Sequence, residues 1–288
     1  MAESPAHRFG QIIGDSLEAA VEPLLADFAN EHGLYLDKKG KRTCRRGAKA
    51  SWTDLYNNTH DLDFVLERGG SDAKRGRPAA FIETAWRRYT KHSRNKAQEI
   101  QGAILPLLET YRRDAPFAGA ILAGVFTEGA LAQLKSLGFA VVYIPFEDVI
   151  QAFRHVGIDA HFGEATRDAD FARKVRAWSR LSPGKRARVS RFLIEASSPQ
   201  ITAFFERLRG VIVRKLTGIR ITPLHGEAAE TRTVKEAIYF VDRYDETAAH
   251  SALVRYEVEV LYSNGDRIQG AFAAKGDAIS FLESLGEA

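Results

Sequence analysis

The sequence predicts an α/β protein with a mixed central sheet flanked by helices, followed by a smaller C-terminal α+β domain. Two short apolar runs, 118–126 and 139–145, alternate with amphipathic helical patterns, as is typical of parallel strands joined by helices. Before them, 60–67 and 79–89 have strand-like patterns and are separated by a polar turn. After residue 210 the pattern changes to strands, which indicates a second domain.

The first half is expected to begin with a helix over 8–31, where apolar residues recur at helical spacing. Pro23 lies inside that segment and predicts a kink or a break into two short helices. Thr127 is expected to cap a helix that Gly138 ends. The other expected elements are strands over 34–37, 60–67, 79–89, 118–126 and 139–145, and helices over 94–112, 127–137 and 146–156.

The second half is expected to open with two helices, 166–180 and 183–208, the latter with Ser182 as N-cap and Pro183 at its first position. Ser263-Asn264-Gly265-Asp266 lies between alternating segments and predicts a β-hairpin. We see no internal repeat. The remaining elements are expected as strands over 211–222, 234–243, 253–262 and 266–273, and a helix over 276–285.

Composition excludes several classes of protein. The 288 residues are 45% hydrophobic and 27% charged, which excludes a disordered or collagen-like chain. The single cysteine, Cys44, excludes an internal disulfide and a cysteine-based zinc site, and fits a reducing compartment. No apolar run approaches the roughly 18 residues of a membrane span, and the N-terminal residues lack a signal-peptide pattern. We therefore expect a cytoplasmic protein without a membrane partner.

Positive charge is concentrated in three segments that contain no acid. Residues 38–49, 85–96 and 173–191 hold 20 of the 41 Lys and Arg residues, although the net charge of the whole chain is only +4. Basic surfaces on an otherwise acidic protein are typical of polyanion binding, because contacts to phosphates release counterions. Single charge runs are usually solvated faces, but three of them favour nucleic acid as the partner.

Two carboxylates are the strongest candidates for chemistry. Asp63 and Glu83 lie in consecutive predicted strands, so a hairpin between the strands would place them opposite each other. Carboxylates this close repel and normally share a proton or a cation, and oxygen ligands suit Mg²⁺. Asp61 shares a face with Asp63, but Asp63 lies between Leu62 and Phe64 and is the preferred ligand. Ordinary carboxylates at a sheet edge, paired with arginines, are the alternative interpretation.

The order of these elements over residues 8–145 resembles the PD-(D/E)XK nuclease superfamily, the fold of most Type II restriction endonucleases. The resemblance is carried by Asp63 in the second strand and by Glu83-Thr84-Ala85 in the third. It implies a Mg²⁺-dependent enzyme that hydrolyses phosphodiester bonds in DNA, with Asp63 and Glu83 as metal ligands. The family's lysine position is occupied by Ala85, which cannot stabilise charge.

Several residues could replace that lysine or assist it. Arg87 lies on the same strand face as Glu83, whereas Lys91 and Lys96 follow at the strand end and the start of the next helix. The two lysines are preferred, since an ammonium replaces an ammonium better than a guanidinium does. By resemblance, Gln98 matches a polar helix residue of one branch of the family. Glu18, with Gly14 allowing close packing, would be an accessory metal contact.

The whole sequence therefore predicts a site-specific Mg²⁺-dependent endonuclease that acts on double-stranded DNA as a homodimer. A structure-specific repair nuclease and a non-cleaving DNA-binding module remain alternatives. Residues 1–160 would form the nuclease core, 161–210 a basic helical connection, and 211–288 a domain for dimerisation or DNA specificity. The residues expected to contact DNA are Lys38, Lys39, Lys41, Arg42, Arg45, Arg46, Arg88, Arg94, Lys185, Arg186 and Arg188.

Overall fold

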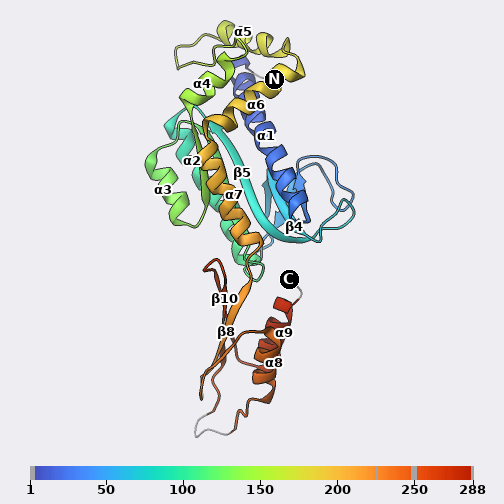
Figure 1. The fold of residues 1–288 in the computed structure, drawn as a ribbon. Coiled ribbons are helices and arrows are strands. Elements are labelled where there is room, and N and C mark those ends of the chain that lie inside the picture. Colours follow the sequence, from blue (N-terminus) through green and yellow to red (C-terminus); the bar gives the residue numbers. More distant parts are fainter. Residues whose placement is uncertain (1–3, 225, 248–251, 287–288) are drawn as a thin grey trace. The chain divides into compact units, whose positions relative to one another are not determined.

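The computed structural model describes residues 4–224, 226–247 and 252–286. The chain divides into two compact units, with the division between Arg209 and Gly210 (Figure 1). The basic helices of residues 168–196 belong to the first unit.

The first unit contains a five-stranded mixed sheet, as the sequence predicts. Its order is β1 (Leu34–Lys38), β4 (Phe64–Arg68), β5 (Arg77–Arg87), β6 (Phe117–Gly124) and β7 (Ala140–Pro145). β1, β4 and β5 pair antiparallel, whereas β5, β6 and β7 pair parallel. Every residue of β6 is buried, as expected for a central apolar strand. β7 is half-buried because it forms an edge of the sheet.

One predicted strand is two strands in the structure. Residues 60–67 divide at Asp63 into β3 (Thr59–Leu62) and β4, and β3 leaves the central sheet to pair with β2 (Ala50–Thr53). The strand β2 was not predicted. The division has a local cause, because the Asp63 amide donates to the Glu83 side chain instead of to a neighbouring strand.

Seven helices accompany this sheet in the described part of the first unit: α1 (Pro5–Glu31), α2 (Thr90–Thr110), α3 (Glu128–Ser136), α4 (Phe146–Arg154), α5 (Asp168–Ser179), α6 (Pro183–Ala196) and α7 (Ser198–Ile212). The helix α1 continues through Pro23, so the break into two short helices, one of the two expected outcomes, does not occur. This helix contacts β1 and β5. The predicted helix 183–208 is wrong in extent, since it is divided at the buried Ser197. Thr127 and Ser182 cap α3 and α6 as predicted.

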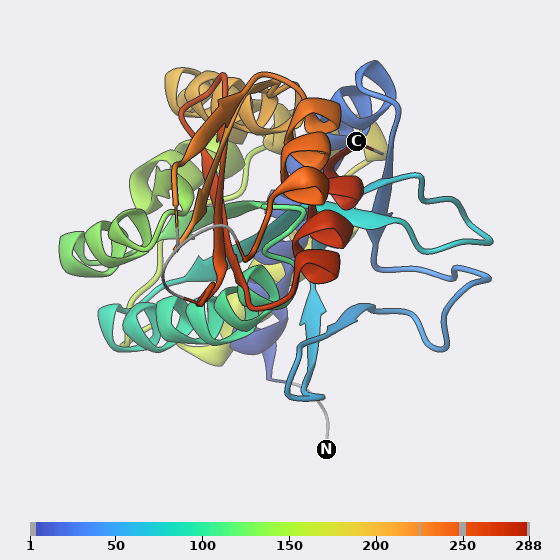
Figure 2. The ribbon, with the colours of Figure 1, turned by 90° about the horizontal axis from the view of Figure 1, so that it is seen from below.

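Two long loops extend together from the β1 edge of the sheet. Residues 39–49 connect β1 to β2, and residues 69–76 connect β4 to β5. Both views show these loops side by side, beyond the ends of the strands (Figures 1 and 2).

The second unit is an antiparallel sheet with two helices. The strand order is β11 (Arg267–Phe272), β10 (Tyr256–Tyr262), β8 (Leu216–Pro223) and β9 (Ala229–Thr231). The predicted hairpin at 263–266 is present, with Gly265 at a φ of 86°. The predicted strand 234–243 is wrong, because these residues form helix α8 (Val234–Arg243). Thr233 caps α8 by accepting from the Glu236 amide.

This unit is an internal repeat, which the sequence analysis missed. Each half is strand, strand, helix, and the helices α8 and α9 (Lys275–Gly286) contain the related segments EAIYFVD and DAISFLE. The offset that aligns Ala237 with Ala278 also aligns Val241 with Leu282, and all four side chains are fully buried. The strands follow the same symmetry, with β8 and β10 in the centre and β9 and β11 outside.

Candidate active site

The structure brings Asp63 and Glu83 into direct contact. The antiparallel register pairs Phe64 with Ile82, so Asp63, one residue before the strand, lies beside Glu83. The Asp63 amide donates to Glu83 Oε1 at 3.2 Å. Asp63 Oδ2 accepts from the amide and the hydroxyl of Thr84, each at 2.8 Å. Thr84 therefore orients the Asp63 carboxylate, a role that the sequence analysis did not assign.

Glu83 is the most strongly perturbed acid of this group. Glu83 is only 5% exposed to solvent. Burial, followed by the negative charge of Asp63, raises the pKa of Glu83 to about 7, while Lys96 acts in the opposite direction. A carboxyl with such a pKa can release its proton to solvent near neutral pH when a cation binds in its place. Perturbed acids of this kind are enriched at functional sites.

Lys96 is the cation that reaches the carboxylates. It extends from α2, and its Nζ lies 3.3 Å from Glu83 Oε2. Ala85 is buried in the same hydrophobic core cluster as Ala97 of α2, and it also lines a cavity at Asp63. Arg87 borders the same cavity, and its guanidinium lies 3.9 Å from Glu99.

Two further candidates on α2 lie elsewhere. Lys91 and Gln98 are exposed, and neither is among the residues that line the cavity at Asp63. Lys91 precedes Lys96 by more than one turn, and Gln98 is rotated away from Lys96 around the helix. Neither residue is therefore assigned to the cluster.

A cavity of about 440 Å³ opens beside the side chains of Asp63 and Lys96. One wall is α1, including Gly10, Gly14 and Glu18, and the other wall comes from the strand residues. Burial, and then the negative charges of Asp63 and Asp15, raise the pKa of Glu18 to about 6. The expected packing role of Gly14 is wrong, because a Cβ built there meets no atom within 4 Å. Gly14 instead leaves the cavity open.

The donor set fits a divalent cation held by two carboxylates. In the described ranges no cluster of three or more His, Cys, Asp or Glu side chains is arranged as a metal site. Mg²⁺ commonly uses one or two protein carboxylates and keeps several waters. Burial, followed by the negative charge of Asp63, raises the pKa of Glu83, and a bound cation would offset both effects by stabilising the charged carboxylate. Asp63 and Glu83 are the residues that would hold it.

Asp61 lies outside this cluster. Its carboxylate pairs with Lys49 at 2.6 Å and accepts from Ser51 at 2.6 Å, and these bonds lower its pKa. The structure therefore selects Asp63 from the two aspartates as the neighbour of Glu83.

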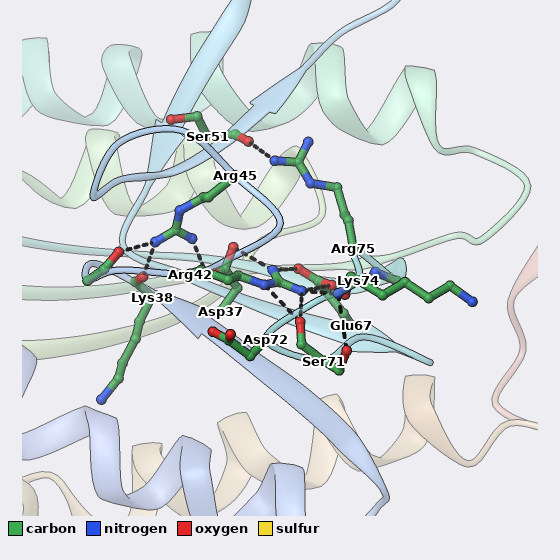
Figure 3. Close-up of polar contacts among 12 residues, drawn as sticks. Asp37, Lys38, Arg42, Arg45, Ser51, Glu67, Ser71, Asp72, Lys74 and Arg75 are labelled. Atoms are coloured by element: carbon green, nitrogen blue, oxygen red, sulfur yellow. Dashed lines mark hydrogen bonds and ion pairs between the residues drawn. The ribbon is translucent and has the colours of Figure 1, made fainter.

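The basic residues of the sequence divide into buried and exposed groups. Arg42 and Arg45 are not the exposed cations that were expected, because their side chains are 2% and 4% exposed and hold the 39–49 loop through Asp37 (Figure 3). Lys38 is paired with Glu22.

Two other cations also have partners within the protein. Arg88 donates to the Phe162 carbonyl at 2.9 Å and lies over the Phe146 ring. Arg186 donates to the Ser179 carbonyl at 3.1 Å and lies over the Trp178 ring. The predicted DNA-contacting residues that are exposed are Lys39, Lys41, Arg46, Arg94, Lys185 and Arg188.

The chain has no match that assigns it to a family of known proteins. No protein-family model matches the chain, and no curated protein matches its sequence. One solved structure, a crystal structure of a protein of unknown function, AF1548, aligns with 66% of this chain and 99% of its own length, at 10% identity and a TM-score of 0.27. A similarity of this size supports no argument about fold or function. Among the described helices, none is both long and apolar enough to cross a bilayer.

Proposed function

We propose that the protein is a Mg²⁺-dependent endonuclease that hydrolyses phosphodiester bonds in DNA. The observation that carries the proposal is the cluster of Asp63, Glu83 and Lys96 beside an open cavity. Two carboxylates and one ammonium provide the charges that hydrolysis of a phosphodiester needs: ligands for a cation and a positive group for the extra negative charge of the transition state.

Each side chain has a distinct part in this proposal. Asp63 and Glu83 hold the ion, and Thr84 keeps the Asp63 carboxylate in one orientation. The bound Mg²⁺ supplies polarisation of the phosphoryl oxygen and a lower pKa for an attacking water. Lys96, 20% exposed, can turn from Glu83 towards a phosphate in the cavity. Arg87 lines the same cavity and offers a second positive group to the DNA backbone.

A restriction-type enzyme is the form we favour, and it would act in the cytoplasm. Cleavage of both strands at a symmetric site calls for a homodimer, because the symmetry of the site matches that of the protein. The single cysteine supports a reducing compartment.

A non-cleaving DNA-binding module is the second candidate, and Ala85 favours it. This residue stands where the resembling family has lysine. The contact between Lys96 and Glu83 favours cleavage instead, because it provides an ammonium at the carboxylates from a different element.

The deciding experiment is incubation of plasmid and phage DNA with the protein in Mg²⁺ or in EDTA. The variants are Glu83→Gln and Lys96→Met, and Asp61→Asn is the matched control, an acid outside the cluster. We expect discrete fragments in Mg²⁺ for the wild type and for Asp61→Asn, and none for the other two. A smear would indicate a repair-type enzyme. Salt-sensitive binding without cleavage, on methylated and unmethylated DNA alike, would contradict the nuclease and select the binding module.

A further inference from the structure

The loops 39–49 and 69–76 are joined through one buried guanidinium. Arg42 donates to both carboxylate oxygens of Glu67, at 2.5 and 2.9 Å, and forms an ion pair with Asp37 at 2.9 Å. It also donates to the Ser71 carbonyl at 3.1 and 2.8 Å and to the Lys74 carbonyl at 2.8 Å. Figure 3 shows this guanidinium pointing from the first loop into the second. We call the two loops together the double-loop arm.

Further bonds hold the double-loop arm in one conformation. The Thr43 hydroxyl and the Cys44 amide both donate to the Asp72 carbonyl, at 2.8 and 3.0 Å. Arg75 donates to the Ser51 carbonyl at 3.0 Å. The base of the second loop is closely packed, since a Cβ at Gly76 would lie 2.3 Å from the Arg68 carbonyl. The arm is therefore preformed and does not need a ligand to order it.

The exposed surface of the arm carries an excess of positive charge. Lys39, Lys41, Arg46 and Lys74 are exposed, and in the described part of the chain none of them has a carboxylate within ion-pair distance. The one acid of these two loops, Asp72, is also exposed, and its carboxylate accepts from the Thr43 hydroxyl, so these four cations share this surface with one acid. Lys74 comes from the second loop, so the positive surface is wider than the 39–49 segment alone.

The arm lies beside the candidate active site. The positive charge of Lys39 lowers the pKa of Glu18, which borders the cavity, so the start of the first loop lies within electrostatic range of that wall. Lys38 pairs with Glu22, one turn further along α1. A polyanion in contact with the arm would thus lie next to the α1 wall of the cavity.

We propose that the double-loop arm is a preformed contact surface for the phosphates of duplex DNA, with Lys41, Arg46 and Lys74 as its contacts. This inference rests on the proposed function only in placing the arm beside an active site for DNA. The contact between the exposed cations and phosphates does not depend on cleavage. Proteins that hold single strands stack bases on aromatic side chains, and neither loop contains an aromatic residue. A rigid surface that carries only point charges is suited to the fixed phosphate spacing of a duplex.

The test is binding of a labelled short duplex, measured by anisotropy in EDTA so that cleavage plays no part. The variant is K41A/R46A/K74A, and Lys39 is left in place because it acts on Glu18. The matched control is K135A/R154A/R207A, three exposed cations near β7, which is the opposite edge of the sheet from β1. Between about 50 and 200 mM salt, loss of three phosphate contacts should reduce the slope of log Kd against log salt by about 2 to 3. Affinity should fall on the order of tenfold or more, with unchanged thermal unfolding.

Each outcome separates the arm from the nuclease. Equal binding by the two triple variants would overturn the arm while leaving cleavage by the wild type intact. Arm-dependent binding without cleavage in Mg²⁺ would support the arm and contradict the nuclease. An unlabelled single strand that competes as well as the duplex would overturn the duplex as partner. Absence of any binding by the wild type in EDTA would overturn the arm, and cleavage in Mg²⁺ would then decide separately about the nuclease.

Discussion

The Lys96 ammonium lies 3.3 Å from a Glu83 carboxylate oxygen, although the two side chains come from different elements, α2 and β5. The Lys96 side chain lines the same cavity as Asp63, and the buried Glu83 accepts a hydrogen bond from the Asp63 amide. The neighbouring position on β5 carries only the methyl group of Ala85. The positive charge at the carboxylates is therefore supplied by the helix and not by the strand.

Replacing Lys96 with methionine should abolish most cleavage while leaving the fold intact. The side chain keeps its length, but the transition state loses a positive group, and such losses typically cost on the order of 10² to 10³ in rate. Single-turnover cleavage in Mg²⁺ measures the effect. Lys91→Met is the control, because Lys91 is exposed at the start of the same helix and should retain its rate. Equal loss in both variants would argue against a special role for Lys96.

The pH dependence of stability should report on Glu83. Its pKa is raised from 4.5 to about 7, so the folded protein binds more protons than the unfolded chain between these values. The stability that this group contributes is present below pH 4.5 and is lost as the pH rises to about 7, by about 3 kcal/mol when complete.

The Glu83→Gln variant should lack that part of the pH dependence. Urea unfolding at pH 5 and pH 8, in EDTA, measures the free energy of unfolding for both proteins. The wild type should lose more stability than the variant across this interval. Asp61→Asn is the control, since the pKa of Asp61 is lowered and its contribution has the opposite sign. A wild type and a Glu83→Gln variant with the same pH dependence would disprove this electrostatic account.

Thr84→Val should weaken the response to Mg²⁺ more than it weakens the fold. Valine keeps the shape of threonine but removes the hydroxyl that donates to Asp63 Oδ2. Loss of a residue that orients a metal ligand typically costs about 10- to 100-fold in metal affinity. The rise in Tm with increasing Mg²⁺ at pH 8 measures that affinity. Asp63→Asn is the reference whose Tm should not respond to Mg²⁺. If the Tm of Thr84→Val rises at the same Mg²⁺ concentration as that of the wild type, the orienting role of Thr84 is contradicted.

Removing Arg42 should destabilise the protein strongly. Its guanidinium and its partners Asp37 and Glu67 are almost completely buried, so Arg42→Met leaves the Glu67 carboxylate buried without its cation, while Asp37 keeps Arg45. Breaking a buried pair in this way costs about 3 to 5 kcal/mol. Urea unfolding measures this cost, and exposed Arg46→Met should change stability by less than about 0.5 kcal/mol. Similar values for the two variants would show that the ion-pair cluster is not a stabilising element.

The central sheet could be predicted because its strands have hydrophobic patterns that distinguish them from the helices and turns around them. The buried run of β6 and the polar turn between β4 and β5 are local signals. The helix α8 was mistaken for a strand because its ten residues include Ile238, Tyr239, Phe240 and Val241, which favour strands when periodicity is short. Comparison with DAISFLE of α9, which was predicted correctly as a helix, would have resolved the ambiguity.

The candidate site was predictable only in part. The proximity of Asp63 and Glu83 follows from the register of two consecutive strands. The choice among Arg87, Lys91 and Lys96 depends on how α2 begins and packs, which no local pattern determines. The burial of Arg42 could not be predicted either, because runs of charge are usually solvated and its partners come from β1 and β4.

The way in which Arg42 holds the second loop leaves most of that loop free to vary in sequence. Its bonds to Ser71 and Lys74 go to main-chain carbonyls, which every amino acid possesses. Gly70 and Gly76, at the two ends of the loop, cannot be exchanged in this way, because a side chain at either position would collide with its neighbours. Substitutions at residues 73 and 74 could therefore change how strongly the arm holds a duplex while the bonds from Arg42 to the main chain stay in place.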